Sequence, residues 1–250
     1  MANPLLLIGQ LITLLMAAGL LGTLYTALRR AMKRLRQPHF QQRKASGFAT
    51  AALLIWMLIS GVLAELPGPR GGSLPAIRAL LLFLLPALIF AGLLGFRFFR
   101  ALLIAIPPNW LVKVQGIRIV LNLLLWMGYE GRYVPPQLTF LWFNYDIVVG
   151  ISALMGSYAF FAGNRIRRPE ALLWNVFGLF SLLYLVLIGL ISLPDPSWQL
   201  FKTVPDSSFL LQTAFVPLLS FVLPFCFAMH LYAIWQMLRL PSRRQFVLRR

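Results

Sequence analysis

Three polar side chains interrupt an apolar stretch of the sequence at helical spacing. Gln115, Arg118 and Asn122, in the segment WLVKVQGIRIVLNLLLW, stand at positions i, i+3 and i+7. In an α-helix these positions lie on one face. An arginine near the middle of a membrane costs at least about 2.5 kcal/mol, so it normally faces the protein interior and is paired. The spacing therefore predicts a polar helix face that can hold a polar or anionic group.

Asp146 is the expected partner of Arg118, because it is the only acidic residue embedded in an apolar run. It follows Asn144 in the segment WFNYDIVVG. Counting about 1.5 Å per residue from the inner ends of the two expected helices puts the two charged residues about 12 Å apart in depth. A direct pair then requires tilted helices or different helix ends, and Asn122 lies between the two and could bridge them. The alternative is that Asp146 stays near the outer surface, within reach of water.

Two further polar residues, Asn175 and His230, lie in later apolar runs at a depth similar to that of Arg118. Two interpretations of the whole set are open. The residues form interhelical hydrogen bonds, each worth only about 0.6 kcal/mol on average, or they line a polar cavity. We favour the cavity because seven residues on several helices are involved. The predicted ligand-binding residues are Gln115, Arg118, Asn122, Asn144, Asp146, Asn175 and His230.

Several classes of chemistry find no support in the sequence. His230 is the only histidine within an apolar run, which excludes haem ligation by two membrane histidines. Cys226 is the only cysteine, which excludes disulfides and cysteine-based metal clusters. No HExxH, GxSxG, Walker or CxxC motif occurs, and the last apolar run has no lysine for a retinal-type Schiff base. We predict no catalytic residues, no metal site and no cofactor.

The composition predicts that these residues lie in a membrane. The 250-residue chain is 60% hydrophobic and 12% charged, with a mean hydropathy of +0.79, whereas soluble proteins are about a quarter charged. We expect an all-α, polytopic integral membrane protein with one domain, residues 1–250. A helix needs about 20 apolar residues to cross the bilayer. Seven segments meet this length, at about 4–28, 47–64, 75–95, 110–129, 140–162, 171–193 and 210–238.

The basic residues predict the orientation. Of 23 Lys and Arg, 17 fall in the first, third and fifth connections and the C-terminal tail, and four fall in the other connections (Arg70, Arg78, Arg132 and Lys202). By the positive-inside rule the N-terminus is outside and the C-terminus cytoplasmic, in a bacterial inner membrane. The net charge of +17 is spread between apolar runs, which does not indicate nucleic-acid binding. The expected partners are the bilayer, anionic lipids at the cytoplasmic face and a small-molecule ligand.

Small residues and prolines predict how the helices pack. Small residues spaced by about one turn allow close backbone approach, as at Ala18 and Gly22 and along Gly150, Ala153 and Ser157. Each proline inside a membrane helix frees a carbonyl that needs another partner, and this applies to Pro86, Pro217 and Pro224.

Residues 105–238 contain, in this order, WL..Q..R, a G..P turn, N.D...G..A, WN..G and a late helix with proline and histidine. In this order of motifs the segment resembles a family of uncharacterised bacterial multi-spanning membrane proteins. The resemblance implies that the polar positions recur together, which favours a site, and it implies no activity. Asn122 stands where related sequences often carry an acid, which argues against a mechanism with two membrane carboxylates. The matched residues are Trp110, Leu111, Gln115, Arg118, Asn144, Asp146, Gly150, Ala153, Trp174, Asn175, Gly178 and His230.

Three functions compete. The first is a permease or ligand-binding membrane protein that holds a small polar or anionic molecule at Arg118. The second is a non-enzymatic scaffold or sensor that docks a partner through its basic cytoplasmic face. The third is a membrane enzyme acting on a lipid-linked substrate, with Asp146 or His230 as acid or base. A general base must lie within about 3 Å of its target. Asp146 and His230 are expected to lie about four helical turns apart, which makes the enzyme the least favoured of the three.

Overall fold

The computed structural model describes residues 3–66, 74–162 and 166–239. This part of the chain is built from helices and contains no β-strand. Six helical segments are long and apolar enough to cross a membrane: Pro4–Arg34, His39–Glu65, Pro75–Gly95, Pro108–Glu130, Arg168–Ile191 and Leu218–Arg239. The basic residues Arg70, Arg165, Arg243, Arg244, Arg249 and Arg250 lie outside the described residues.

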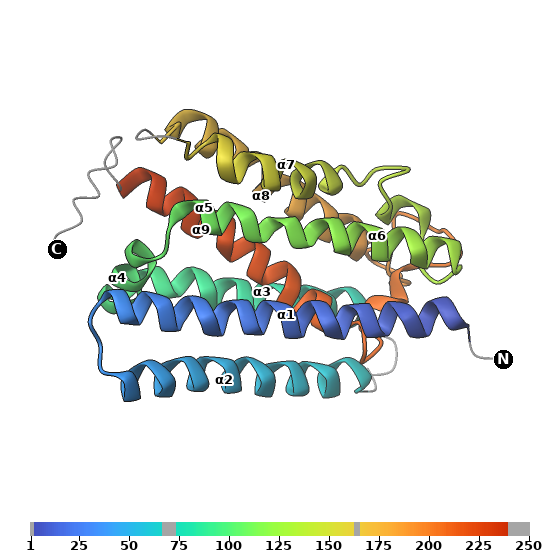
Figure 1. Ribbon diagram of the computed structural model, residues 1–250. Helices are drawn as coiled ribbons and strands as arrows, with labels where there is room; N and C mark the ends of the chain where they lie inside the picture. Colours follow the sequence, from blue (N-terminus) through green and yellow to red (C-terminus); the bar gives the residue numbers. More distant parts are fainter. Residues whose placement is uncertain (1–2, 67–73, 163–165, 240–250) are drawn as a thin grey trace.

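The helices form one bundle whose long members run roughly along a common axis (Figure 1). Its α-helices are α1 (Pro4–Arg34), α2 (His39–Glu65), α3 (Leu74–Gly92), α4 (Arg97–Ala105), α5 (Pro108–Lys113), α6 (Ile117–Glu130), α7 (Asp146–Ala159), α8 (Arg168–Ile191) and α9 (Leu223–Arg239). Short 3-10 turns are η1 (Leu93–Gly95), η2 (Val114–Gly116), η3 (Pro136–Leu138) and η4 (Ser207–Leu211). A π-helical turn, η5 (Leu218–Val222), precedes α9.

The first two helices extend further than their apolar segments. The Asn3 side chain accepts a hydrogen bond from the Leu5 amide and caps α1. The chain then stays helical through most of the basic segment that the sequence assigned to a connection. Helix α1 ends where Arg36 takes a positive φ of 55°, and Pro38 precedes α2. Most of the basic side chains of this segment are therefore held on helices, and Arg36 lies in the turn between them.

Helix α9 occupies the centre of the bundle and packs against α3, α5 and α8 (Figure 1). The proline at 224 cannot donate to the carbonyl of Ser220 four residues earlier. That carbonyl accepts a hydrogen bond of 2.8 Å from the indole of Trp56 on α2. The Ser220 hydroxyl also accepts one of 3.0 Å from Ser60. The carbonyl of Ser220 that the proline leaves without a helical partner is thus satisfied by a side chain of α2, as a membrane interior requires.

The segment expected to be the fifth span is the main departure from the sequence prediction. Instead of a helix over 140–162, α7 covers 14 residues, Asp146–Ala159, and is apolar but shorter than the six helical segments that are long enough to cross a membrane. Residues 139–145 form turns. The sequence could not reveal this because LWF in the turn region is as apolar as a helix. The consequence is that Asp146 opens a helix rather than standing inside one.

Small residues produce close packing at one of the two predicted places. On α7, a Cβ added to Gly150 would lie 2.8 Å from the backbone nitrogen of Ile119, so α6 and α7 are in backbone contact there. On α1 the expectation is wrong. Ala18 and Gly22 are exposed, and a Cβ at Gly22 would meet nothing within 4 Å.

Candidate functional site

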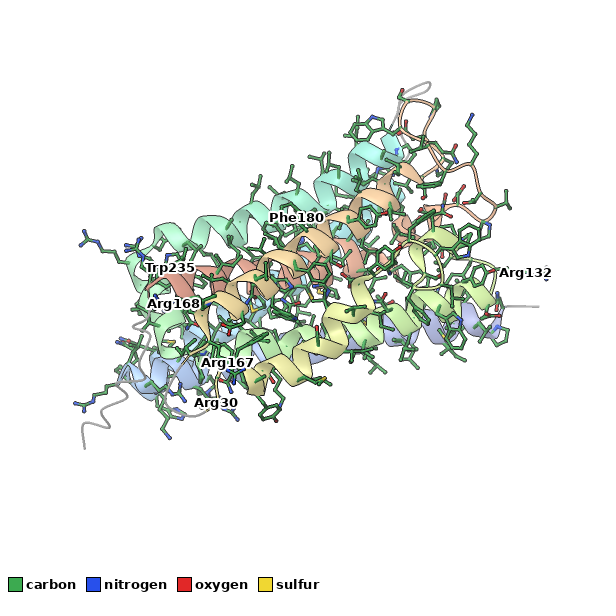
Figure 2. The ribbon with its side chains drawn as sticks, turned by 90° about the horizontal axis from the view of Figure 1, so that it is seen from above. Arg30, Arg132, Arg167, Arg168, Phe180 and Trp235 are labelled. Atoms are coloured by element: carbon green, nitrogen blue, oxygen red, sulfur yellow. The ribbon has the colours of Figure 1, made fainter. Side chains whose placement is uncertain are left out.

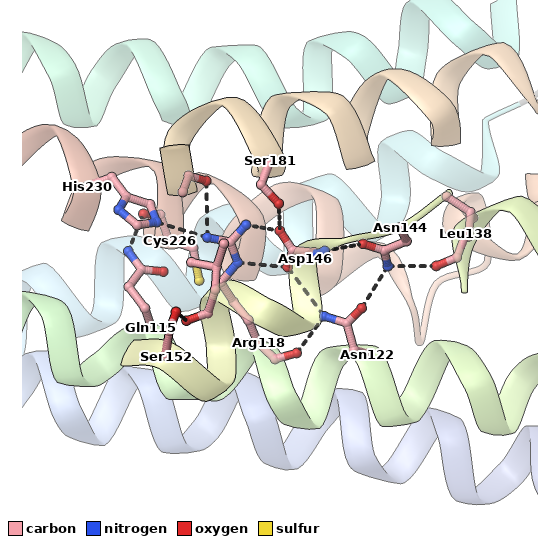
Figure 3. Close-up of polar contacts among 12 residues, drawn as sticks. Gln115, Arg118, Asn122, Leu138, Asn144, Asp146, Ser152, Ser181, Cys226 and His230 are labelled. Atoms are coloured by element: carbon pink, nitrogen blue, oxygen red, sulfur yellow. Dashed lines mark hydrogen bonds and ion pairs between the residues drawn. The ribbon is translucent and has the colours of Figure 1, made fainter. Parts of the chain in front are cut away.

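The structure brings six of the seven predicted polar residues into one hydrogen-bonded cluster between α6, α7, α8 and α9. Figure 3 shows how five of them, Arg118, Asn122, Asn144, Asp146 and His230, point toward one another. We call this set the Arg118 network: Arg118, Asn122, Asn144, Asp146, Asn175 and His230. Five of the six side chains are completely buried, and Asn144 is 1% exposed. The network is closed in this conformation, because its polar atoms are turned toward one another.

Arg118 is the centre of the network. Its Nε donates to Asp146 Oδ2 over 2.7 Å, and its Nη2 forms an ion pair with Asp146 Oδ1. Its Nη1 donates to the carbonyl of Gly178 over 3.1 Å and lies 2.9 Å from Nε2 of His230. Three different helices, α7, α8 and α9, therefore hold one guanidinium group.

The direct pair corrects the predicted separation of about 12 Å. Helix α7 ends at Ala159, and α5 begins at Pro108. Counted from these ends at about 1.5 Å per residue, Asp146 is about 20 Å deep and Arg118 about 15 Å. An arginine side chain spans the remaining difference of about 5 Å, so the bridge through Asn122 is not needed.

Asp146 is held by more than the arginine. Ser181 on α8 donates to its Oδ1 over 3.0 Å, and its own amide donates to Oδ1 of Asn144 over 2.9 Å. Because Asp146 is the first residue of α7, its carboxylate also lies at the positive end of that helix dipole. The site thus stabilises a negative charge at this position through a cation, a hydroxyl and a helix terminus.

The two asparagines connect the pair to the non-helical segment before α7. Asn122 donates to the carbonyl of Arg118 over 2.8 Å, and its amide nitrogen lies 3.4 Å from Asp146 Oδ2. Asn144 donates to Oδ1 of Asn122 over 2.7 Å and to the carbonyl of Leu138 over 2.8 Å. Asn144 therefore satisfies the carbonyl of Leu138, directly before the non-helical residues 139–145, and the amide of Asp146, directly after them. Buried backbone groups at the ends of a non-helical segment require such partners.

The histidine end of the network has a defined tautomer. Asn175 donates its amide nitrogen to the carbonyl of Ala171 over 2.7 Å, so its Oδ1 accepts from Nδ1 of His230 at 3.0 Å. Nε2 of His230 then accepts from Arg118. Gly178 makes room for the ring, because a Cβ there would lie 2.3 Å from His230 Cε1.

Gln115 lies near the network without joining it. Its amide nitrogen donates to the carbonyl of Cys226 over 2.9 Å, and its Oε1 is buried with no hydrogen-bond partner among the described residues. Three cavities in the part of the chain that the structure describes are lined by other residues, between the apolar side chains of α6, α8 and α9 and at the basic end of α1. The polar cavity expected from the sequence stays a prediction for another conformation.

Three polar residues that make side-chain contacts were missed from the sequence. Gln137 donates to the hydroxyls of Ser192 and Thr203, each over 2.9 Å. Asp195 is completely buried and accepts from the amides of Ala76, at the start of α3, and Ser197. Loop residues of this kind look water-exposed in a sequence. Ser181 was missed for a different reason, since a single serine in an apolar helix carries no signal.

The arrangement pairs a buried cation with a buried carboxylate and leaves neither the acid nor the histidine of the network free to react. Asp146 and His230 both contact Arg118, so neither presents an unbound group to a substrate. Among the described residues, no group of three or more His, Cys, Asp or Glu side chains is placed to hold a metal ion. What the site offers is a guanidinium group whose carboxylate partner belongs to a short helix.

Comparison with known proteins gives no relative. No protein-family model, no curated protein and no solved structure matches this chain. The resemblance described from the sequence motifs therefore stays a prediction, and the site must be interpreted from its own geometry.

Proposed function

We propose that the chain is a membrane-embedded binding protein or permease with an intramembrane site for a small polar or anionic ligand, centred on Arg118. The observation that supports the proposal is the completely buried Arg118–Asp146 pair. In this proposal the Asp146 carboxylate occupies the anion position of the empty site, and a ligand carboxylate or phosphate replaces it.

Stability alone is a weak reason for such a pair. Removing two charges from water costs several kcal/mol per ion, and well-packed apolar residues in place of a buried pair are often as stable or more stable. In addition, the backbone carbonyl of Gly178 and the ring of His230 orient the guanidinium. A positioned, desolvated arginine is suited to recognition of a carboxylate or phosphate, because its donors match their geometry.

The helices around the pair support movement of Asp146. Helix α7 starts at this residue, and the preceding residues 139–145 are not helical. The π-helical turn η5 lies directly before α9, which carries His230. Interrupted helices whose N-termini point at anionic groups are typical of the binding sites of transporters, and π-helical turns occur frequently at functional sites.

The proposal includes seven crossings, with the N-terminus outside and the C-terminus cytoplasmic in a bacterial inner membrane. The start of α1 and the end of α9 lie at opposite ends of the bundle (Figure 1). Arg30, Arg167 and Arg168 lie at one end, and Arg132 lies at the other (Figure 2). This distribution supports an orientation in which the end with Arg30 faces the cytoplasm.

Cysteine labelling tests the topology. In a Cys226→Ala background, single changes Gln37→Cys, Arg132→Cys and Arg167→Cys are labelled in intact cells with a membrane-impermeant maleimide. We expect label at position 132 and none at 37 and 167 until the cells are permeabilised. Label at both 132 and 167 in intact cells would mean that α7 does not cross the membrane.

Ligand-dependent thermal unfolding tests the site. The purified protein in nanodiscs is titrated with acetate, succinate and inorganic phosphate, using the wild type, Asp146→Asn and the double variant Arg118→Met/Asp146→Asn. A ligand at 100 times its Kd stabilises by about 2.7 kcal/mol. We expect at least one anion to raise the Tm of the wild type, and to raise it more in Asp146→Asn, where no internal carboxylate competes.

The double variant is the matched control, since it has no buried charge to strand and keeps the side-chain volumes similar. It should fold and show no anion-dependent shift. An equal shift in the double variant, or no shift in Asp146→Asn, would contradict an anion site at Arg118 and leave the network as a structural one.

A further inference from the structure

One face of α1 is uncovered along much of its length and changes character from apolar to basic. Leu15, Gly19, Gly22, Thr26, Arg30 and Lys33 are spaced by three or four residues, so they lie in one stripe. All six are exposed. A Cβ added to Gly19 or Gly22 would meet nothing within 4 Å. We call this stripe the α1 groove.

The basic end of the α1 groove opens into a cavity of about 240 Å³, lined by Tyr25, Thr26, Arg29, Arg30, Lys33 and Gln42. Gln42 comes from α2 and is buried, and its amide nitrogen donates to the carbonyl of Gln37. The cavity thus has walls from two helices and three cationic side chains. Arg30, which lines the cavity, lies at the same end of the bundle as Arg167 and Arg168 (Figure 2).

The cationic side chains of this region are not equivalent. Arg29 lies 3.2 Å from His39 Nε2 and over the ring of Tyr25. Arg34 donates to the carbonyl of Ala105 at 2.6 Å. Within the described residues the side chains of Arg30 and Lys33 have no such partner. These two charges are therefore available to a ligand in the cavity.

We infer that the α1 groove binds an anionic phospholipid, with the phosphate between Arg30 and Lys33 and an acyl chain along Gly22 and Gly19. The order of groups along the stripe, apolar, then hydroxyl, then basic, is the order of acyl chain, glycerol ester and phosphate in a lipid. From Leu15 to Thr26 the helix rises about 16 Å, close to the half-thickness of about 15 Å of the hydrocarbon core. Basic pockets beside membrane helices recognise anionic head groups.

This lipid site is separate from the Arg118 network, so its test is independent of the proposed function. Native mass spectrometry in neutral detergent counts phosphatidylglycerol molecules retained by the full chain, with phosphatidylcholine as the neutral comparison lipid. The variant Arg30→Gln/Lys33→Gln is compared with Arg43→Gln/Lys44→Gln. The control removes the same charge from exposed residues of α2 that do not line the cavity.

We expect the wild type to retain phosphatidylglycerol over phosphatidylcholine, and the α1 variant to bind it about fivefold more weakly for each charge removed. The control should bind like the wild type. Equal loss in both variants would show that only total charge matters and would overturn the site.

Filling the groove gives a second, independent measurement. Gly22→Leu places a side chain in the acyl-chain path, whereas Gly47→Leu adds the same side chain at an open position of α2. Only Gly22→Leu should reduce lipid retention, and both proteins should stay monodisperse with unchanged Tm. If Gly22→Leu has no effect, and inorganic phosphate binds with the same dependence on Arg30 and Lys33, the occupant is free phosphate and the lipid proposal fails.

Discussion

Two buried aspartates in this protein are satisfied in opposite ways. Asp146 and Asp195 are both completely buried. The described partners of Asp195 are the backbone amides of Ala76 and Ser197, which lie at the start of α3 and in its own turn. The carboxylate of Asp146 instead accepts from side chains on other helices, Arg118 and Ser181.

The difference separates a local role from a role shared among helices. A carboxylate that caps a helix is explained by the amides it accepts from, since the first turn of a helix leaves its amides without partners. The pairing of Asp146 with Arg118 has no such local explanation, because the two side chains come from different helices. Removing either side chain would leave the charge of the other buried without a counter-ion. Burial by itself therefore does not distinguish the two roles, whereas the origin of the hydrogen-bond partners does.

The largest effect should come from breaking the charged pair. Arg118→Met leaves the Asp146 carboxylate buried without its cation, and we expect a loss of about 3–5 kcal/mol in unfolding free energy. The double variant Arg118→Met/Asp146→Asn should recover most of this loss. Thermal unfolding of the purified variants measures both. A single variant as stable as the wild type would show that the pair contributes nothing, and the contrast with Asp195 would disappear.

An intermediate effect is expected where α8 makes room for His230. Gly178→Ala puts a Cβ 2.3 Å from the imidazole, so the ring must move away from Arg118. Overpacking of this kind costs about 1–3 kcal/mol. Gly189→Ala on the same helix is the control, because its nearest neighbour is the flexible end of Leu210 at 3.2 Å. Equal Tm values for the two variants would mean that the His230 contact does not constrain the site.

Much of the fold was readable from the sequence because hydropathy reports length and apolarity directly. Six of the seven expected spans correspond to helices long enough to cross a membrane. The expected helix over 140–162 was wrong at its start, since residues 139–145 are apolar but turn. The expected helix over 210–238 was also wrong at its start, because η4 and a turn precede the spanning segment, which begins at Leu218. Hydropathy does not distinguish an apolar helix from an apolar turn whose ends are held by side-chain hydrogen bonds. Here Asn144 donates to the side chain of Asn122 and to the carbonyl of Leu138.

The network was partly readable for a related reason. Arg118, Asp146 and His230 stand out because charged and imidazole side chains are rare in apolar runs. The carbonyl of Gly178 and the hydroxyl of Ser181 could not be found in this way, because every residue has a carbonyl and serines are common in membrane helices. Asp195 was overlooked since its partners are backbone amides, which leave no trace in a sequence.

The smallest effect should come from Asp195, and it tests the other half of the comparison. Asp195→Ala removes the acceptor for the Ala76 and Ser197 amides, and loss of a helix cap costs about 1 kcal/mol. Asp195→Asn keeps an oxygen in the same place, and asparagine caps helices about as well as aspartate. We therefore expect Asp195→Asn to unfold near the wild-type temperature. Asp146→Asn should instead unfold well below it, because the charge of Arg118 loses its counter-ion. Should Asp195→Asn be as unstable as Asp195→Ala, the negative charge itself would be required at position 195, and the two aspartates would have to be explained in the same way.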